Sequence, residues 1–186
     1  MSVLLLNASP HPHGSCVAIL RAIQSGAEDA GEVAWVDVNH LDMLPCLGCM
    51  RCRQDGECVQ PEDDAHRIGR RIREASSLVV GTPTYWGNMT GPLKLLFDRN
   101  VPAFLGIKGG HPQGKGQTAA IVATCDTAWP ISQLSSQAGG AVRAVRRILA
   151  SAGYRIVGSI IYPCAREEQE VPPSVLHRAV TLGRHL

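Results

Sequence analysis

Short apolar runs alternate with helical patterns along this chain, and this alternation restricts the fold more than any other feature. Five runs are typical of buried strands, because each is short, nearly continuous and rich in aliphatic residues. The predicted strands are Val3–Leu6, Val33–Val38, Leu78–Gly81, Thr118–Thr124 and Tyr154–Tyr162. Strands that alternate with helices form a parallel sheet with helices on both faces.

Five helices are predicted between and after these strands. They cover Ser15–Ala30, a segment that begins at Asp63-Asp64, Thr90–Arg99, Ile131–Ala152 and Pro172–Leu186. Right-handed crossovers leave few ways to connect such elements. We therefore expect a single α/β domain over residues 1–186, a flavodoxin-like three-layer sandwich with strand order 2-1-3-4-5 and a cysteine-rich insertion at 46–58 after the second strand.

Charge and hydropathy exclude several classes of function. A net charge of +2 and an aromatic fraction of 4% argue against a nucleic-acid partner. The apolar run Val3–Leu6 is too short for a signal peptide or a membrane span. We therefore expect a cytoplasmic protein with no membrane partner, whose seven cysteines are reduced.

The loops that follow strands one, three and four are rich in small or polar residues. They are Ser9–Cys16, Pro83–Met89 and Cys125–Pro130. In doubly wound sheets, ligands bind outside the carboxyl ends of the strands, where the strand order reverses. These three loops therefore predict the binding site.

The first of these loops has features of a phosphate site. Backbone amides at a helix N-terminus bind anions, and Ser9 and Ser15 would add hydroxyls. The loop matches neither the dinucleotide glycine motif nor the P-loop motif. The alternative interpretation is an ordinary strand–helix turn that binds nothing.

The second loop places two aromatic residues, Tyr85 and Trp86, at the end of a strand. A planar ring system would rest against them, with Thr84 and Asn88 bonding its heteroatoms. The alternative is that the aromatic side chains pack under the following helix or at a subunit contact.

Four cysteines, Cys46, Cys49, Cys52 and Cys58, follow the spacing C-x2-C-x2-C-x5-C. Three closely spaced thiolates and one more distant suit a 4Fe–4S cluster, and Gly48 and Gly56 would permit the tight turns. Zinc usually takes ligands from two separated pairs, so it fits less well. Thiols without a metal remain the third interpretation.

Taken together, these segments resemble a known family. Ser9-Pro10 with Gly14-Ser15 resembles the first loop of NADPH-dependent FMN reductases and flavodoxin-like oxidoreductases. The segment from Pro83 to Asp98-Arg99 is similar to that family's second signature, and Cys46–Asp64 is similar to the cysteine segment of its iron–sulfur flavoproteins.

The resemblance implies FMN as the cofactor. It assigns the phosphate to Ser9, His11, Ser15 and Cys16. It assigns the ribityl chain and ring to Pro83, Thr84, Tyr85, Trp86, Gly87 and Asn88. It assigns the pyrimidine side to Thr124, Cys125 and Asp126. Two residues depart from the family pattern, because His11 stands where arginine is common and Cys16 where threonine or serine is usual.

The resemblance also implies the activity. The leading hypothesis is an FMN-dependent oxidoreductase that passes electrons from NAD(P)H to a quinone, an azo or nitro compound or another acceptor. The alternative is an iron–sulfur flavoprotein that carries electrons between ferredoxin-type donors and FMN, as a homodimer or homotetramer. A third hypothesis is a binding module that has lost its cofactor. No catalytic residue is assigned, and Asp98 and Arg99 are expected to pair with each other at a helix end.

Overall fold

The computed structural model describes residues 2–29, 31–108, 110, 113–165 and 170–186. Its strands form one parallel sheet in the order β2-β1-β3-β4-β5, which confirms the predicted flavodoxin-like order. Leu5 at the centre of β1 lies opposite Trp35 on one side and Val79 on the other. The strands are β1 (Ser2–Asn7), β2 (Glu32–Asp37), β3 (Ser77–Pro83), β4 (Thr118–Thr124) and β5 (Arg155–Tyr162).

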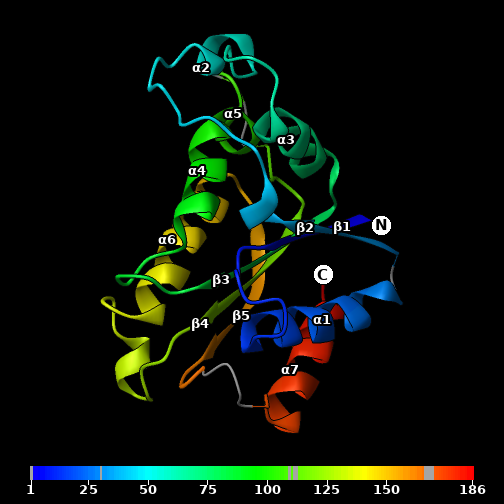
Figure 1. The fold of residues 1–186 in the computed structure, drawn as a ribbon. Coiled ribbons are helices and arrows are strands. Elements are labelled where there is room, and N and C mark those ends of the chain that lie inside the picture. Colours follow the sequence, from blue (N-terminus) through cyan, green and yellow to red (C-terminus); the bar gives the residue numbers. More distant parts are fainter. Residues whose placement is uncertain (1, 30, 109, 111–112, 166–169) are drawn as a thin grey trace.

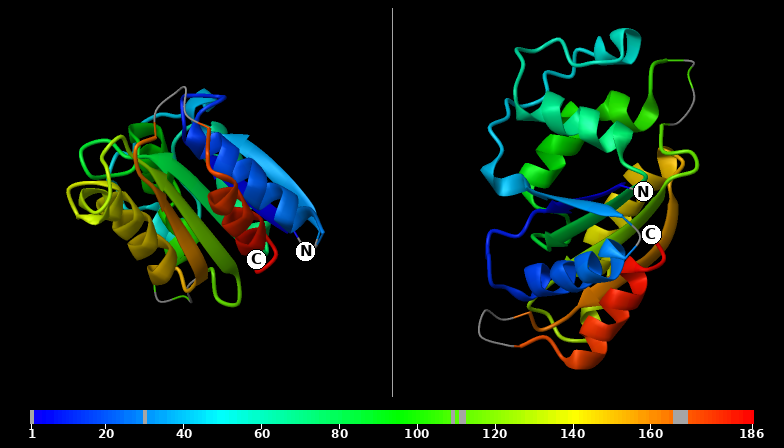
Figure 2. Two further views of the ribbon diagram at one scale, coloured as in Figure 1. Left: turned by 90° about the horizontal axis from the view of Figure 1, so that it is seen from below. Right: turned by 90° about the vertical axis from the view of Figure 1, so that its right-hand side faces the viewer.

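Two helices cover one face of the sheet and the remaining long helices cover the other (Figures 1 and 2). The long helices are α1 (Ser15–Glu28), α3 (Asp64–Glu74), α4 (Gly91–Arg99), α6 (Ala138–Ser151) and α7 (Pro173–Gly183). The short ones are η1 (Val38–His40), α2 (Cys52–Asp55), α5 (Val101–Leu105) and η2 (Ile131–Gln133). None of the helices in the described part of the chain has the length and apolarity that crossing a bilayer would require.

Alternation along the central strands explains the two core layers. Leu4 and Leu6 of β1 belong to the cluster packed under α3, α4 and α6, whereas Val3 and Leu5 belong to the cluster under α1 and α7. Successive side chains of a strand point to opposite faces, so a continuous apolar run fills both layers.

The predicted long helix Ile131–Ala152 was wrong at its start. The chain forms η2, turns through extended backbone at Leu134 and Gln137, and begins α6 only at Ala138. Gly140 explains the turn, because a Cβ there would lie 2.1 Å from the Ser135 carbonyl oxygen and 2.2 Å from that of Gly87. The glycine thus lets two loops pack against the start of the helix.

Other boundaries differ by a few residues. The last helix ends at Gly183 rather than Leu186, and α5 was not predicted. The predicted end of the first helix, Ala30, lies outside the described residues.

Candidate functional site

The loops after β1, β3 and β4 meet at the carboxyl edge of the sheet and enclose a cavity of about 350 Å³. Ligand pockets in proteins are typically about 300 to 1,000 Å³. Ten of the thirteen residues predicted to bind the cofactor line this cavity, and they are Ser9, His11, Ser15, Cys16, Pro83, Thr84, Tyr85, Thr124, Cys125 and Asp126. Among the residues that the structure describes, Gly14 and Ala165 also line it.

The first loop presents an uncapped helix N-terminus to the cavity. Helix α1 follows Gly14, and no side chain caps its first amides. The Ser15 hydroxyl is buried and has no hydrogen-bond partner among the described residues. Ser9 is held in place, because its amide donates to the Asn7 side chain and its hydroxyl accepts from the His11 amide. A buried hydroxyl beside free helical amides fits a bound anion.

Cys16, the next residue of α1, is a buried part of the same wall. Burial raises the pKa of its thiol to about 12. Cys16 therefore offers the cavity a neutral S–H group and no negative charge at neutral pH, which suits an anionic ligand.

The second loop is a tight hairpin turn. Tyr85 and Asn88 exchange two backbone hydrogen bonds of 3.0 Å, and Trp86 and Gly87 between them have φ values of 53° and 71°. Such positive values are typical of a type I′ turn. Tyr85 lines the cavity, whereas Trp86, Gly87 and Asn88 lie outside its lining.

The two aromatic side chains differ in exposure. Tyr85 is 49% exposed and Trp86 is fully exposed, so neither is packed under the following helix. Thr84, beside them, has a buried hydroxyl that finds no partner within the described part of the chain. Thr84 therefore gives the cavity a second hydroxyl group that is open to a ligand.

The third loop ties the cavity to the end of β5. The Cys125 amide donates to the Tyr162 carbonyl, and the Ala165 amide donates to the Cys125 carbonyl. These bonds bring Ala165 into the wall. Sequence reasoning missed this residue, although the position just beyond β5, beside the end of β4, was available as a signal.

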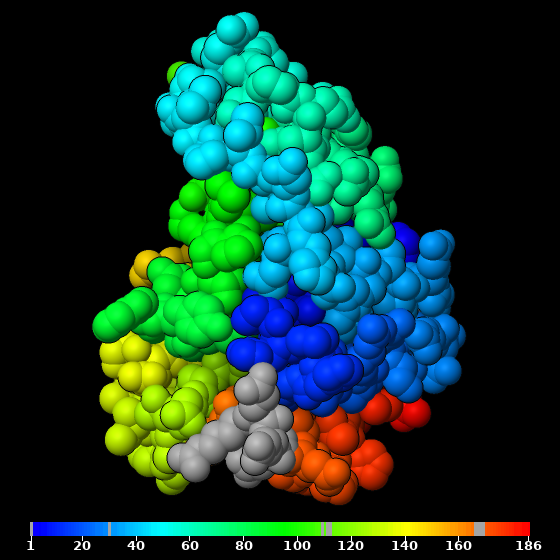
Figure 3. Space-filling model, viewed as in Figure 1, coloured from blue at the N-terminus to red at the C-terminus, as the bar shows by residue number. Residues whose placement is uncertain are grey.

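The cysteine segment lies elsewhere, in the projection that carries α2 at the opposite end of the molecule from α7 (Figures 1 and 3). Cys46 and Cys49 are exposed, while Cys52 and Cys58 are half-buried. Gly48 and Gly56 have φ values of 65° and 83°, so both provide the tight turns that were predicted for them.

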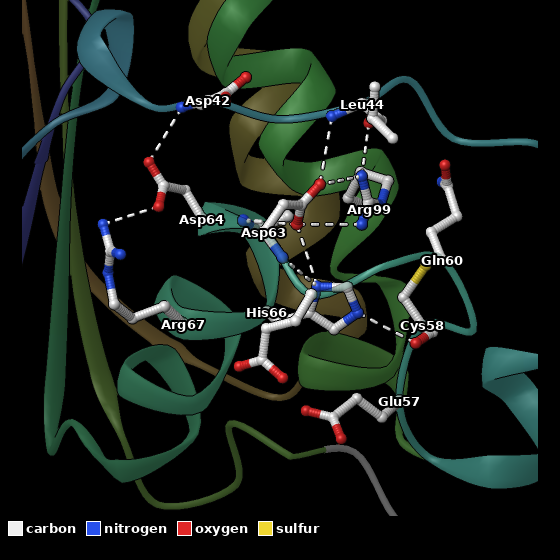
Figure 4. Close-up of polar contacts among 12 residues, drawn as sticks. Asp42, Leu44, Glu57, Cys58, Gln60, Asp63, Asp64, His66, Arg67 and Arg99 are labelled. Carbon is white, nitrogen blue, oxygen red and sulfur yellow. Dashed lines mark hydrogen bonds and ion pairs between the residues drawn. The ribbon is translucent and has the colours of Figure 1, made fainter.

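A buried polar network fixes both ends of this segment (Figure 4). The Arg99 side chain is fully buried; it donates to both carboxylate oxygens of Asp63, at 2.6 and 3.1 Å, and to the Leu44 carbonyl at 2.6 Å. The Leu44 amide donates back to Asp63, and the His66 ring bonds the Cys58 carbonyl at 3.0 Å through Nε2. Leu44 and Cys58 flank the exposed stretch, so the network clamps it at its base.

The network also lowers the pKa of Asp63. Burial alone would raise the pKa of Asp63, but hydrogen bonds from Arg99, the Leu44 amide and His66 outweigh it and hold that pKa below its usual value. Asp63 accepts from the Ala65 amide as well and so caps α3, which begins at Asp64, where the sequence predicted a helix to start. The expected pairing of Asp98 with Arg99 was wrong. Asp98 pairs with Lys94 on the exposed face, because Arg99 points into the core toward Asp63.

The four thiols interact electrostatically without forming a closed site. Burial raises the pKa of Cys52, and the nearby Cys58, Cys46 and Cys49 raise it further. Among the residues that the structure describes, no three His, Cys, Asp or Glu side chains come close enough to hold a metal ion. The donor set is that of a cluster, but the segment would have to rearrange to bring the sulfurs together.

Comparison with known proteins places these observations in a family context. The model of the NADPH-dependent FMN reductase family matches residues 1–162. An iron–sulfur flavoprotein of Methanocaldococcus jannaschii is 31% identical over 109 residues, which is 58% of this chain and 56% of the relative. An iron–sulfur flavoprotein of Archaeoglobus fulgidus is 34% identical over 107 residues, which is 57% of this chain and 52% of the relative. The matches thus span about half the length of these curated relatives.

Solved structures share the fold. An azoreductase from Bacillus anthracis has a TM-score of 0.75 at 15% identity and covers all of both chains. An NAD(P)H:quinone oxidoreductase from Methanothermobacter marburgensis has a TM-score of 0.68 at 19% identity. The match covers 100% of this chain and 96% of the oxidoreductase chain. At such low identity the likeness shows the fold alone.

Proposed function

The chain belongs to the NADPH-dependent FMN reductase family, and from this premise we propose that it is an FMN-dependent oxidoreductase. It takes electrons from NAD(P)H and passes them to a quinone, an azo or nitro compound or another acceptor. The observation that carries the proposal is the cavity at the sheet edge. In it the buried Ser15 hydroxyl, which has no hydrogen-bond partner in the described part of the chain, lies beside the N-terminus of α1.

The donors around the cavity suit the parts of FMN. Ser9, His11, Ser15 and Cys16 would hold the phosphate, with the amides of α1 supplying most of the attraction. Ser15 donates a hydroxyl that now lacks a partner, so binding removes the cost of a buried unsatisfied group.

The other loops would hold the rest of the cofactor. The stretch 83–88 would contact the ribityl chain and ring, with the Thr84 hydroxyl as a free donor. Thr124, Cys125 and Asp126 would line the pyrimidine side. FMN held there would supply the hydride acceptor, and these residues would orient it.

Two titrations test this proposal. Adding apoprotein to FMN should quench flavin fluorescence with a saturable, one-to-one stoichiometry. NADPH or NADH alone should then bleach the flavin absorbance band under anaerobic conditions. A protein that takes up no FMN would refute the proposal. If FMN binds but neither NADPH nor NADH bleaches it, NAD(P)H is not the electron donor.

The second candidate function is an electron carrier with an iron–sulfur cluster. It is favoured by the C-x2-C-x2-C-x5-C spacing and by the electrostatic coupling of Cys52 to the other three thiols. In this reading the cluster exchanges single electrons with a ferredoxin-type donor and with FMN. Iron and acid-labile sulfide in anaerobically purified protein would support it.

A cysteine variant separates the cluster from the flavin. Cys49→Ala should abolish any cluster absorbance and iron content while FMN still binds, because Cys49 is exposed and does not line the cavity. Cys164→Ala is the matched control and should keep both. Loss of FMN binding in Cys49→Ala would mean that the segment supports the cavity itself.

The assembly and location are also proposals. Large apolar side chains near the cavity are exposed, with Trp86 fully exposed and Trp129 at 71%. Such exposure supports a subunit contact in a homodimer or homotetramer, and light scattering of wild type and Trp86→Asp would measure the mass.

A cytoplasmic location accords with seven cysteines that are all free.

A further inference from the structure

Two cysteines that no metal or cluster hypothesis uses lie close together at the ends of β4 and β5, and one of them, Cys125, lines the cavity. Cys125 follows the last residue of β4, and Cys164 lies two residues beyond the end of β5. The sheet pairs Thr124 with Tyr162, and the pairing continues one step further. The Cys125 amide donates to the Tyr162 carbonyl at 3.1 Å, and its carbonyl accepts from the Ala165 amide at 2.9 Å.

These two hydrogen bonds place Cys164 beside Cys125. A residue in a regular parallel ladder bonds the carbonyl before and the amide after a single neighbour, and the register makes Pro163 that neighbour. Here Pro163 and Cys164 both lie between the two groups, so Cys164, with a φ of 52°, is the extra residue of a bulge that adjoins Cys125. Neighbouring strands lie about 4.7–4.9 Å apart, and disulfides join residues whose Cα atoms are about 4.4–6.8 Å apart. A disulfide between the two residues therefore requires that the bulge turn the Cys164 side chain toward Cys125.

The Thr127 carbonyl also brings the two residues together. The Cys125 thiol donates to the Thr127 carbonyl at 3.5 Å, and the Cys164 amide donates to the same oxygen at 3.4 Å. Burial raises the pKa of Cys125, backbone hydrogen bonds at Thr127 and Ala138 oppose this, and the nearby Cys164 raises it further.

The two thiols differ in exposure. Cys125 is 7% exposed and lines the cavity, whereas Cys164 is half-buried and lies outside the lining. Cys164 is therefore the more accessible of the two thiols to a reagent from solvent, while Cys125 faces the cavity. This is the arrangement of an attacking thiol and a resolving thiol.

We propose that Cys125 and Cys164 form a reversible dithiol–disulfide pair in the wall of the cavity, and that its oxidation weakens the binding of FMN. The effect on FMN rests on the function proposed above. The oxidant is a low-molecular-weight disulfide. The Cys164 thiolate attacks one of its sulfurs and releases one thiolate. Cys125 then loses its proton and attacks the Cys164 sulfur, which releases the second thiol.

This exchange conserves atoms and electrons. Two protein thiols are oxidised to one disulfide, and one small disulfide is reduced to two thiols. A small dithiol reverses the change. The Cys125 sulfur must leave the Thr127 carbonyl to reach Cys164, so the wall beside Thr124 and Ala165 changes shape. Coupling between two sites typically changes affinity by about 5- to 150-fold, so we expect FMN to bind at least about fivefold more weakly after oxidation.

Peptide mapping tests the thiol pair without reference to FMN. Reduced full-length protein is treated with oxidised glutathione, alkylated and digested with trypsin without reduction. Peptides 116–143 and 156–166 contain Cys125 and Cys164 as their single cysteines, and they should be recovered linked to each other. Absence of the linked peptide while Cys46–Cys58 become oxidised would overturn the proposal.

Flavin titration of the same samples tests the consequence. Cys164→Ser should give no linked peptide and should keep the FMN affinity of the reduced protein after treatment with the oxidant. Equal FMN affinity of the linked and reduced wild-type protein would overturn the regulatory effect. Reduced protein that binds no FMN would refute the proposed function instead, and a linked peptide would still establish the thiol pair.

Discussion

The cavity and the cysteine segment are built in opposite ways. The cavity forms where β1, β3 and β4 end, and main-chain hydrogen bonds such as those between Thr84 and Thr124 tie its loops directly to the sheet. The cysteine segment projects from the sheet with Cys46 and Cys49 exposed, and polar contacts secure it at its base (Figure 4). The cavity thus depends on topology, whereas the segment depends on a few buried side chains.

Removal of the Arg99 side chain should have the largest effect on how firmly the cysteine segment is held. Arg99→Ala leaves Asp63 with a half-buried charge and frees the Leu44 carbonyl. Breaking a buried ion pair by removing one partner costs about 3–5 kcal/mol. We expect a loss of unfolding free energy near 3 kcal/mol in urea titrations, together with faster alkylation of Cys58.

The FMN affinity of Arg99→Ala separates the two regions. Arg99 does not line the cavity, so folded Arg99→Ala should bind FMN as well as wild type does. A fall in affinity comparable to the fall in stability would contradict the independence of the cavity from the segment.

The complementary variant acts on the cavity alone. Ser15→Asp puts a carboxylate where the phosphate is proposed to lie, and repulsion together with a lost hydrogen bond should weaken FMN binding by roughly 100-fold. Stability should change little, because an acidic residue in the first turn of a helix interacts favourably with its dipole. Fluorescence titration measures the affinity and circular dichroism checks the fold.

Ser25→Asp is the matched control for this variant. It adds the same charge to the exposed face of the same helix. Unchanged affinity in Ser15→Asp, or an equal loss in Ser25→Asp, would contradict the placement of the phosphate.

The contrast also explains what the sequence could predict. The apolar runs of β1, β3 and β4 determine the strand order, and the strand order alone brings Ser9, Thr84 and Cys125 to one edge. Local pattern was therefore sufficient for the fold and for most of the cavity.

The local sequence pattern could not predict long-range side-chain contacts. Arg99 and Asp63 are 36 positions apart, and nothing near Arg99 in the sequence distinguishes a buried partner at Asp63 from its neighbour Asp98. The late start of α6 depends on the close approach of Gly140 to the Gly87 loop, which is also a tertiary contact. Sequence reasoning therefore failed mainly where distant segments meet.

Acid should weaken the segment before it affects the cavity. The folded pKa of Asp63 lies below its ordinary value of 3.8. The stabilisation is therefore fully present above about pH 4 and is lost as pH falls through the folded pKa. As the pH falls from about 4 to the folded pKa of Asp63, the alkylation rate of Cys58 in the wild-type protein should rise. The reagent must be one that reacts with neutral thiols.

Asp63→Asn separates this titration from general acid unfolding. The variant should alkylate quickly at every pH and lose the acid-dependent step. Persistence of the same step in Asp63→Asn would assign it to other carboxylates.

The smallest effect is expected at the ion pair on the opposite side of the same helix. Lys94 and Asp98 are about half exposed, with side-chain exposures of 51% and 45%, and are four residues apart on α4, whereas Arg99 on that helix is buried. Exposed pairs at this spacing contribute about 0.3–0.5 kcal/mol, because water and salt screen the charges. Lys94→Ala should therefore lower the unfolding free energy from urea titration by no more than this and should leave the alkylation rate of Cys58 unchanged. If Lys94→Ala destabilised the protein as much as Arg99→Ala, the effect would belong to α4 as a whole, and the buried position of the Asp63–Arg99 pair would no longer explain how the segment is held.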